Sequence, residues 1–323
     1  MKTFADISLK PYNTFGIDAK VRRFIVLEPG DDVPPLEDNV LLIGGGSNVV
    51  FTKDYDGTVI TLSHNSSNQA IKQSSNLVTA WGGMVMDDLV QWTLDNGLYG
   101  LENLSSIPGT VGASAVQNVG AYGAEAKDFI ESVEAYDLQE RRMCTFSNAS
   151  CHFAYRHSLF KELSGRYLIL RVTYRLSNVF LPNLSYKALE ALPHSSARQL
   201  RNAITDLRWS KLPRPEEHGS AGSFFKNPVV DESTYTRIKA HNADMPDAHK
   251  TNDGYKLSAG WLIDRAGWKG KTMGRAGVWP NNALVLYNTG DCTGQEVVAL
   301  AQAIANDVQT KFGITLEPEA III

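Results

Sequence analysis

The chain has 323 residues, of which 43% are hydrophobic and 20% charged, and its formal net charge at pH 7 is −4. This length suffices for about two or three domains with cores of their own, and the composition is typical of a soluble globular protein. The slightly acidic balance excludes the basic field that nucleic-acid binding needs. No apolar run is long enough to span a membrane, and residues 1–6 lack the apolar segment of a signal peptide. The odd number of cysteines, without a CxxC pair, indicates a reducing compartment rather than a disulfide framework.

The first part of the chain predicts strands, loops and one helix. Apolar residues at helical spacing predict the helix over 87–96, and Gly97 is its natural end. Acidic residues and prolines indicate a loop at 31–37, and a stretch rich in Ser, Asn and Gln indicates a solvated hairpin or loop at 63–75. The β-type runs predict strands at 23–27, 58–62 and 77–81.

Three consecutive glycines, 44–46, are followed by Ser47 and Asn48 and lie between two apolar runs. Glycines have no side chains to pack, but they permit backbone conformations that other residues avoid, and they let a ligand lie directly on the main chain. A pyrophosphate cradled by backbone N–H groups is one such ligand. An ordinary glycine-rich hairpin is the alternative, and this stretch alone favours neither. The spacing differs from the Rossmann fingerprint, and no helix pattern follows at once.

A second stretch dense in small residues runs from 101 to 123, with polar groups between the small ones. A flat group such as an isoalloxazine or a nucleotide can approach the backbone closely along such a segment. A close-packed helix start and loop would have the same composition, so this stretch alone leaves both interpretations open.

The remainder of the chain alternates strand and helix patterns, which favours a mixed α+β architecture. A tract rich in proline and charge, 210–222, is the best candidate for a domain boundary. Strands are predicted at 130–146, 167–176 and 283–287, a short helical region at 183–192, and helices at 195–209, 234–241, 258–266 and 293–312.

Seven short motifs are spread over nearly the whole chain. They are NTFG at 13–16, GGSN at 45–48, IPGTVG at 107–112, QNVGAYG at 117–123, Tyr155-Arg156, AGSFFKNP at 221–228 and LEPE at 316–319. One such motif would be a weak signal, but seven in this order and at compatible spacing are specific. Together they resemble the motifs of the UDP-N-acetylenolpyruvoylglucosamine reductase family, flavin enzymes of peptidoglycan precursor synthesis.

The resemblance implies an α+β fold with a two-lobed FAD-binding domain of the vanillyl-alcohol-oxidase (PCMH) type and a smaller α+β substrate-binding domain. The first lobe is expected at 1–57, with a C-terminal strand at 314–323 returning to it. The second lobe is expected at 58–209 and the substrate-binding domain at 210–313. FAD is expected to be bound non-covalently, with NADPH as co-substrate and a UDP-sugar as substrate. We expect a cytoplasmic monomer without a nucleic-acid or membrane partner and without a metal.

The implied reaction reduces an enolpyruvyl ether on UDP-N-acetylglucosamine to a lactyl ether, with hydride passing from NADPH to FAD and then to the substrate. Arg156 matches the family's catalytic arginine, which can grip the substrate carboxylate through two N–H groups. Ser223 matches the proton donor. Glu319 matches the third catalytic residue, and we expect it to be protonated during turnover or to act through Arg156 or water.

Further positions match the family's binding residues. The segment around Tyr186 resembles the form of the family in which a tyrosine loop closes over the substrate. The cofactor-binding residues implied are Gly44, Gly45, Gly46, Ser47, Asn48, Pro108, Gly109, Thr110, Gly112, Ala113, Asn118 and Gly123. The substrate-binding residues implied are Tyr155, Tyr186, Arg208, Lys211, Asn227 and Asn282, of which Asn282 aligns only loosely.

Two other functions remain compatible with the sequence. A flavin oxidase of the same superfamily would often tether FAD through a histidine near the glycine turn, where His64 is the only candidate. A binder of UDP-sugar or flavin without enzymatic activity would have no use for a proton donor, so Arg156, Ser223 and Glu319 together disfavour it.

Overall fold

The structure is a computed structural model that describes residues 1–36, 39–64 and 70–323. The chain divides into two units, each described by itself below. Unit 1 comprises Met1–Ile7, Val21–Gly46 and Tyr55–Arg208, and unit 2 comprises Ser8–Lys20, Ser47–Asp54 and Trp209–Ile323. The predicted lobes and substrate-binding domain stay predictions.

The first sheet of unit 1 is built around β5, whose residues from Gly57 onward are buried. Such a continuous buried run is typical of a central strand in a parallel sheet, and β5 pairs in parallel with both of its neighbours, β2 and β3. The strand order is β1 (Lys2–Ser8), β2 (Lys20–Leu27), β5 (Tyr55–Leu62) and β3 (Val40–Leu42). The predicted strands at 23–27 and 58–62 are therefore confirmed.

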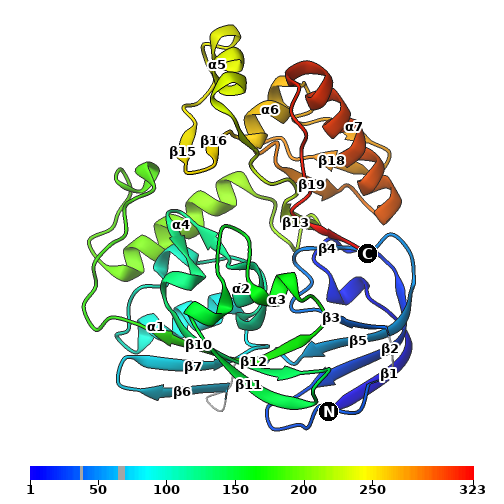
Figure 1. The fold of residues 1–323 in the computed structure, drawn as a ribbon, viewed down its shortest axis with the longest axis vertical. Helices are drawn as coiled ribbons and strands as arrows, with labels where there is room; N and C mark the ends of the chain where they lie inside the picture. Colours follow the sequence, from blue (N-terminus) through cyan, green and yellow to red (C-terminus); the bar gives the residue numbers. More distant parts are fainter. Residues whose placement is uncertain (37–38, 65–69) are drawn as a thin grey trace. The chain divides into compact units, whose positions relative to one another are not determined.

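The second sheet of unit 1 is antiparallel, and β10, β12 and β7 lie side by side in its middle (Figure 1). Helix α2 (Val111–Gln117) packs on β7 and β12, and it also contacts α1 (Met86–Asp95) and α3 (Leu159–Glu162). The strand order is β11 (Arg142–Ser147), β10 (Ile130–Asp137), β12 (Tyr167–Arg175), β7 (Leu77–Trp81) and β6 (Ile71–Ser74). The helix predicted at 87–96 and the strand predicted at 77–81 are confirmed.

Two sequence predictions in unit 1 need correction. The region 130–146 is a hairpin of β10 and β11, because the Asp137 carboxylate accepts hydrogen bonds from the Gln139 and Glu140 N–H groups and turns the chain. Of the predicted helical region 183–192, only a 3-10 helix over Lys187–Leu189 forms.

The loop or hairpin predicted at 63–75 contains strand β6, which forms an antiparallel hairpin with β7. Residues 65–69 and the end of the loop predicted at 31–37 lie outside the described residues.

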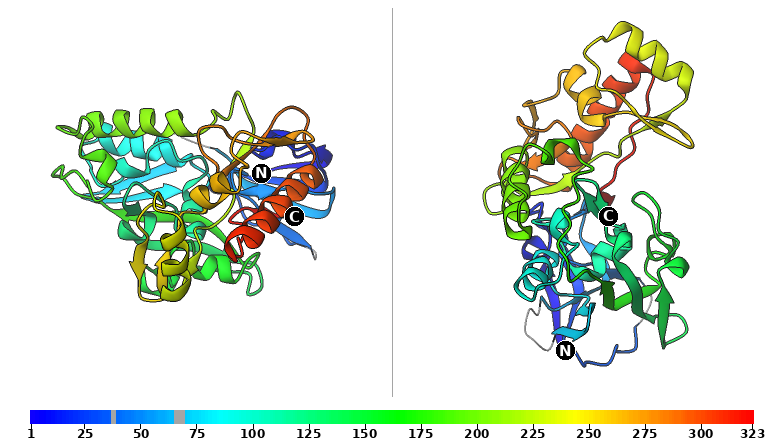
Figure 2. Two further views of the ribbon diagram at one scale, coloured as in Figure 1. Left: turned by 90° about the horizontal axis from the view of Figure 1, so that it is seen from above. Right: turned by 90° about the vertical axis from the view of Figure 1, so that its left-hand side faces the viewer.

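Unit 2 combines small sheets with three helices. Helix α7 (Gly294–Phe312) contacts α6 (Ala259–Arg265) and β18 (Figure 2). Gly313 adopts φ +71°, a left-handed conformation that suits the end of a helix. The first sheet has the order β13 (Ser220–Ser223), β19 (Val285–Asn288), β18 (Ala276–Val278) and β17 (Thr272–Met273). The second has the order β14 (Val229–Val230), β16 (Gly254–Lys256) and β15 (His249–Thr251), and the third pairs β20 (Ile321–Ile322) with β4 (Val49–Val50). The remaining helix, α5, is Glu232–His241.

Two further sequence predictions concern how elements are connected. The glycine turn joins β3 to β4, which belong to different sheets, so the hairpin interpretation of this turn is wrong. Helix α4 (Ala197–Lys211) continues two residues beyond the predicted end at 209, into the tract proposed as a boundary. Within the described residues, no helix is long and apolar enough to cross a membrane.

An ion pair between Asp87 and Arg201 ties α1 to α4. The Arg201 guanidinium donates to both carboxylate oxygens at 2.6 and 2.9 Å, and the Ser106 N–H donates to the same carboxylate at 2.6 Å. Burial alone would raise the pKa of Asp87, but these hydrogen bonds outweigh it and lower the pKa below its ordinary value of 3.8. The pair therefore stabilises the fold above that value, and its contribution is lost as the pH falls through the lower folded-state pKa.

We expect the substitution Asp87→Asn to lower the free energy of unfolding by about 2–3 kcal/mol at neutral pH, because it leaves the partly buried Arg201 without its counter-charge. Urea unfolding measures this loss, and the difference from the unsubstituted chain should shrink toward pH 3. Asp95→Asn is the matched control, since Asp95 pairs with Arg198 between the same two helices but both side chains are about half exposed. Equal losses in the two variants would contradict the importance of the Asp87 pair.

Candidate functional site

The glycine turn lies directly on the start of α2 within unit 1. A Cβ at Gly44 would lie 2.7 Å from Thr110 Oγ1 and 2.9 Å from Ala113 Cβ, and one at Gly45 would lie 3.2 Å from Gly109 Cα. A side chain at Gly44 would therefore collide with the start of α2, and one at Gly45 would press tightly against the Gly109 backbone. The structure thus brings together five of the predicted cofactor residues, which are far apart in the sequence.

The turn also presents hydrogen-bond donors that the protein leaves unused. Among the described residues, the backbone N–H groups of Gly44, Gly45 and Gly46 find no acceptor. By contrast, the Val111 and Gly112 N–H groups at the start of α2 donate to the carbonyls of Met84 and Gly82 at 2.9 and 2.8 Å. Successive free N–H groups form a concave site for anions. The donor set therefore fits the phosphates of a dinucleotide cofactor.

Three other predicted cofactor residues are not brought to this cradle by their contacts. Gly112 faces the Gly82 carbonyl, 3.1 Å from where its Cβ would be, so it lets α2 pack on the sheet. Asn118 uses its whole side chain in hydrogen bonds within the protein. Gly123 packs against Ser185, whose Oγ lies 2.0 Å from the position of a Cβ. Pro108 directly precedes Gly109 of the cradle.

Arg156 lies in a short loop of unit 1 before α3 and adopts φ +53°. Its Nη2 donates to the Gly120 carbonyl at 3.1 Å, and its guanidinium carbon lies 5.6 Å from the centroid of the Tyr155 ring. Lys161 Nζ donates to the Arg156 carbonyl at 3.0 Å. Lys161 is not among the residues predicted from the sequence, where its only signal was a positive charge shortly after the Tyr-Arg pair.

An open pocket of about 430 Å³ lies beside this arginine. Its wall is the hairpin of β8 (Gly120–Ala121) and β9 (Ala124–Glu125), with the residues that follow it. The predicted residues Tyr155, Arg156 and Gly123 all line the pocket, together with Gly120, Ala121, Tyr122, Ala124, Glu125, Lys127 and Asp128.

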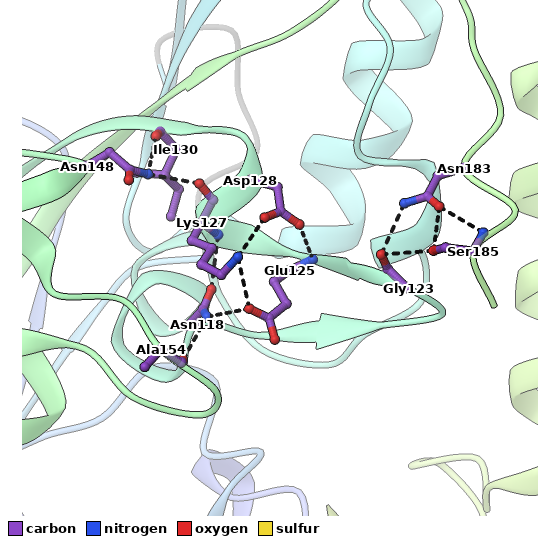
Figure 3. A network of polar contacts seen from close by, with 10 residues as sticks. All are labelled: Asn118, Gly123, Glu125, Lys127, Asp128, Ile130, Asn148, Ala154, Asn183 and Ser185. Carbon is purple, nitrogen blue, oxygen red and sulfur yellow. Dashed lines mark hydrogen bonds and ion pairs between the residues drawn. The ribbon is translucent and has the colours of Figure 1, made fainter. Parts of the chain in front are cut away.

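The tip of the same hairpin contacts the segment that contains Tyr186. The Gly123 carbonyl accepts hydrogen bonds from Asn183 Nδ2 at 3.1 Å and Ser185 Oγ at 3.3 Å (Figure 3). The rings of Tyr122 and Tyr186 meet edge to face, with centroids 5.4 Å apart. Gly123 therefore packs directly against the segment that contains Ser185 and Tyr186. This contact leaves no room for a side chain at Gly123, whose φ is +86°.

Arg208 is a second cation of unit 1 with capacity to bind an anion. Its Nε is buried and has no hydrogen-bond partner among the described residues. Burial lowers the pKa of the guanidinium below its ordinary value, while Tyr122 and Asp87 act in the opposite direction and Arg156 adds to the lowering. An anionic ligand would offset the free-energy cost of burying this positive charge and would reduce the repulsion between Arg208 and Arg156.

In unit 2, Ser223 and Glu319 lie on neighbouring segments. Gly222 adopts φ +68°, and the register of β13 against β19 shifts between Ser220 and Ser223. Such a bulge changes the direction in which the next side chain points. The Glu319 N–H donates to the Phe224 carbonyl at 2.7 Å, and Asn48 Nδ2 donates to the Glu319 carbonyl at 3.1 Å.

The remaining predicted residues of unit 2 support its loops. Asn227 Oδ1 accepts the Ala259 N–H at 3.0 Å at the start of α6, and Asn282 Oδ1 accepts the Leu284 N–H at 3.1 Å. Lys211 is the last residue of α4 and is half-buried, and Ser47 directly precedes Asn48. Contacts of these residues with a substrate or cofactor stay predictions.

Comparison with known proteins gives two family models. Residues 214–323 match the model described as UDP-N-acetylenolpyruvoylglucosamine reductase, C-terminal domain, and residues 36–142 match the model described as FAD binding domain. The second range contains the whole cradle of Gly44–Gly46 and 109–113.

Curated relatives match along nearly the whole chain. A UDP-N-acetylenolpyruvoylglucosamine reductase of Burkholderia ambifaria is 43% identical over 338 aligned positions, covering 98% of this chain and 96% of the relative. The reductase of Pseudomonas aeruginosa is 42% identical, covering 97% and 96%. A solved structure, the UDP-N-acetylenolpyruvylglucosamine reductase of Thermus caldophilus, is similar with a TM-score of 0.71 at 22% identity and covers 100% of this chain and 99% of its own. That likeness supports the predicted fold class.

The substitution Gly44→Ala is expected to weaken FAD binding about tenfold or more, because its methyl group would push the turn away from Thr110 and Ala113. Titration of the apoprotein with FAD, followed by quenching of flavin fluorescence, measures the dissociation constant. Gly260→Ala in α6 is the matched control, since its Cβ would make ordinary contact with Leu284 at 3.4 Å. Unchanged FAD affinity in Gly44→Ala, with a folded protein, would contradict the cradle.

Proposed function

Because this chain belongs to the UDP-N-acetylenolpyruvoylglucosamine reductase family, we propose that it performs the family's reaction with Arg156, Ser223 and Glu319 as its chemical groups. The chain is an FAD-dependent oxidoreductase that reduces UDP-N-acetylglucosamine enolpyruvate to UDP-N-acetylmuramate, with NADPH as the expected hydride donor, in peptidoglycan precursor synthesis. The observation that best supports these roles is the hydrogen bond between Glu319 and Phe224, which holds the predicted carboxyl beside the segment of the predicted proton donor.

The first role of the protein is to bind FAD and the UDP-sugar substrate. Bound FAD supplies the redox chemistry, taking a hydride from NADPH and giving it to the substrate. The free N–H groups of Gly44–Gly46 would hold the cofactor's phosphates. Arg208, with its unused buried Nε, suits an anionic part of the UDP-sugar, and Tyr186, Lys211 and Asn227 are proposed to bind the same molecule.

Arg156 is proposed to bind the carboxylate of the enolpyruvyl group through two N–H groups. Hydride is expected at the terminal methylene carbon, because the negative charge that results then spreads into this carboxylate. A fixed guanidinium stabilises that charge more than it stabilises the starting substrate. The hydrogen bond from Nη2 to the Gly120 carbonyl orients the guanidinium.

Ser223 is proposed to complete the reduction by giving its hydroxyl proton to the carbon that bears the ether oxygen. The substrate thus gains one hydride and one proton, and the serine regains its proton through water or a lysine. A serine hydroxyl stays protonated at neutral pH, whereas an enolic carbanion is basic enough to take the proton. Glu319, which is half-buried, is proposed to act as a protonated acid or through Arg156 or water.

We also propose that the chain acts in the cytoplasm as a monomer on a small UDP-sugar and holds FAD without a covalent bond. Its three free cysteines suit a reducing compartment. His64, the candidate for a covalent bond to FAD, is exposed and lies next to residues outside the described range. Light scattering of the purified protein tests the monomer against its mass of 35.5 kDa. Acid precipitation tests the bond to FAD, since a non-covalent cofactor is released into the supernatant.

Product analysis tests the proposed reaction. The protein is incubated without oxygen with NADPH and UDP-N-acetylglucosamine enolpyruvate, and the UDP-sugar is analysed by mass spectrometry. We expect a product heavier than the substrate by two hydrogen atoms, formed in equal amount to the NADPH consumed. NADPH consumption that requires oxygen and leaves the UDP-sugar unchanged would favour a flavin oxidase instead.

A further inference from the structure

The loop that carries Arg156 is held in an unusual backbone conformation. Arg156 itself adopts φ +53°, a left-handed conformation that is unfavourable for a residue with a side chain. The loop is closed by a pair of backbone hydrogen bonds between Ala154 and His157, at 3.1 and 3.0 Å. A strained loop persists only where its surroundings determine its position. The groups that hold this loop therefore also determine where the guanidinium lies.

Asn118, the residue that ends α2, holds this loop from the side. Its Nδ2 donates to the Ala154 carbonyl and to Glu125 Oε2, both at 2.9 Å, and its Oδ1 accepts the Lys127 N–H at 3.0 Å (Figure 3). The residue is completely buried and adopts φ +42°. Both of its N–H bonds and its carbonyl oxygen are thus engaged within the protein.

Charged neighbours fix the orientation of the Asn118 amide. Lys127 Nζ lies 3.4 Å from Glu125 Oε2 and 2.8 Å from Asp128 Oδ1, and Asp128 Oδ2 accepts the Glu125 N–H at 2.9 Å (Figure 3). The Glu125 carboxylate is therefore held in place and can only accept a hydrogen bond. Consequently the nitrogen of the Asn118 amide points toward Glu125 and Ala154, and its oxygen points toward Lys127.

The same helix end holds Arg156 through two further contacts. Lys161 Nζ bridges Gln117 Oε1 at 2.8 Å and the Arg156 carbonyl at 3.0 Å. The Gly120 carbonyl, two residues after Asn118, accepts the Arg156 guanidinium at 3.1 Å. The loop is thus fastened through the Arg156 carbonyl, through Ala154 and through the Arg156 side chain, each time to the last residue of α2 or to the residues that follow it.

We propose that Asn118 is a positioning residue for the reaction: it fastens the Ala154 carbonyl, keeps Arg156 in its left-handed conformation and so aims the guanidinium at the substrate carboxylate. It takes no part in binding FAD, contrary to the expectation from the sequence. This inference rests on the role of Arg156 under the proposed function. A displacement of about 1 Å in a positioned group can slow a reaction about 100-fold.

The variant Asn118→Gly tests this inference, because glycine keeps the left-handed backbone and removes only the side chain. We expect reoxidation of the NADPH-reduced enzyme by substrate to slow about 10–100-fold, with the FAD dissociation constant changed less than about threefold. Hydrogen exchange read by mass spectrometry should show faster exchange in the loop around Arg156. A double variant with Arg156→Lys should be no slower than Arg156→Lys alone, since both changes act through one group.

Asn148→Ala is the matched control. Asn148 Nδ2 donates to two backbone carbonyls of the same region, those of Lys127 and Ile130, at 2.8 and 2.7 Å (Figure 3). This variant removes two donor hydrogen bonds of an asparagine amide, as Asn118→Gly does, without touching Ala154. We expect it to lower thermal stability while reoxidation and exchange in the arginine loop stay unchanged.

Different outcomes separate this inference from the proposed function. Unchanged exchange in the arginine loop of Asn118→Gly would overturn the positioning role, whatever the rate. Loss of FAD, with the rate restored at saturating FAD, would make Asn118 a cofactor ligand and also overturn it. If the loop loosens but Arg156→Lys reoxidises at the unsubstituted rate, the proposed role of Arg156 is wrong, and the catalytic consequence drawn here is overturned with it.

Discussion

Replacing Ser223 with alanine is expected to slow reoxidation of the reduced enzyme by the enolpyruvyl substrate about 10²–10⁴-fold, the usual contribution of a positioned proton donor. Reduction of the bound flavin by NADPH should keep nearly its normal rate, because no proton is delivered to a carbon in that half of the reaction. Anaerobic stopped-flow absorbance measures the two halves separately. The bulge at Gly222 sets the direction of this serine, so its neighbours on β13 should not share the effect.

The control for this prediction is Ser220→Ala on the same strand. Ser220 contributes its backbone, with its carbonyl accepting the Thr14 hydroxyl at 2.7 Å and its N–H donating to the Thr14 carbonyl at 3.0 Å. Alanine keeps both of these bonds, so both half-reactions should stay at their normal rates. Glu319→Gln tests the role of the carboxyl group, since the amide can still donate a hydrogen bond, as a protonated carboxyl would, and should then keep part of the reoxidation rate. An equal slowing of both half-reactions in Ser223→Ala would contradict a proton donor.

The substitution Arg156→Lys should lower the rate of reoxidation by substrate about 10²–10³-fold, the effect of removing one fixed donor from developing negative charge. Lysine keeps the positive charge but loses the planar fork that grips a carboxylate through two N–H groups. The dissociation constant of the substrate should rise less than the rate falls, because the interaction strengthens as charge develops. Stopped-flow measurements over a range of substrate concentrations give both quantities.

Arg175→Lys is the matched control for Arg156. The Arg175 guanidinium donates to both oxygens of Glu131, at 2.9 and 2.7 Å, and therefore has the same two-pronged geometry on an exposed pair of the same unit. Its loss should leave both half-reactions unchanged. A variant Arg156→Lys that binds substrate weakly but reoxidises at the normal rate when saturated would show that the arginine contributes to binding alone.

The close backbone approach at the proposed cofactor cradle could be predicted from the sequence because it depends on what glycine permits. Three glycines at 44–46 and the small residues at 109–113 each indicated a close backbone approach, although nothing in their spacing indicated that the two stretches meet. The resemblance to a family supplied that connection. The direct contact of Gly44 with Thr110 and Ala113 gives its physical reason.

The contacts of Asn118 and Gly123 within the protein could not be predicted in this way. Their motif is dense in small residues, which is compatible with a cofactor surface and with close packing alike. Asn118 bonds to Ala154, 36 residues away, and Gly123 to Ser185, 62 residues away. Contacts between loops so distant in sequence leave no periodic signal, because they depend on how the second sheet and α2 place the two loops.

Local breaks in regular structure were hard to place from the sequence pattern. The run 130–146 has strand-forming residues on both sides of the polar stretch 137–142, and its turn arises from the side chain of Asp137 bonding back to the chain. The bulge before Ser223 depends on a left-handed glycine, and a glycine in a strand pattern does not by itself reveal which way the next side chain turns.

Anaerobic stopped-flow of the unsubstituted protein tests the central claim most directly. The yellow enzyme is reduced with one equivalent of NADPH and then mixed, without oxygen, with UDP-N-acetylglucosamine enolpyruvate while the oxidised flavin band is followed. We expect the band to return rapidly and completely, at a rate that saturates with substrate concentration. A band that stays bleached with this substrate, and returns only when air is admitted, would contradict the assignment and indicate a flavoprotein with another acceptor.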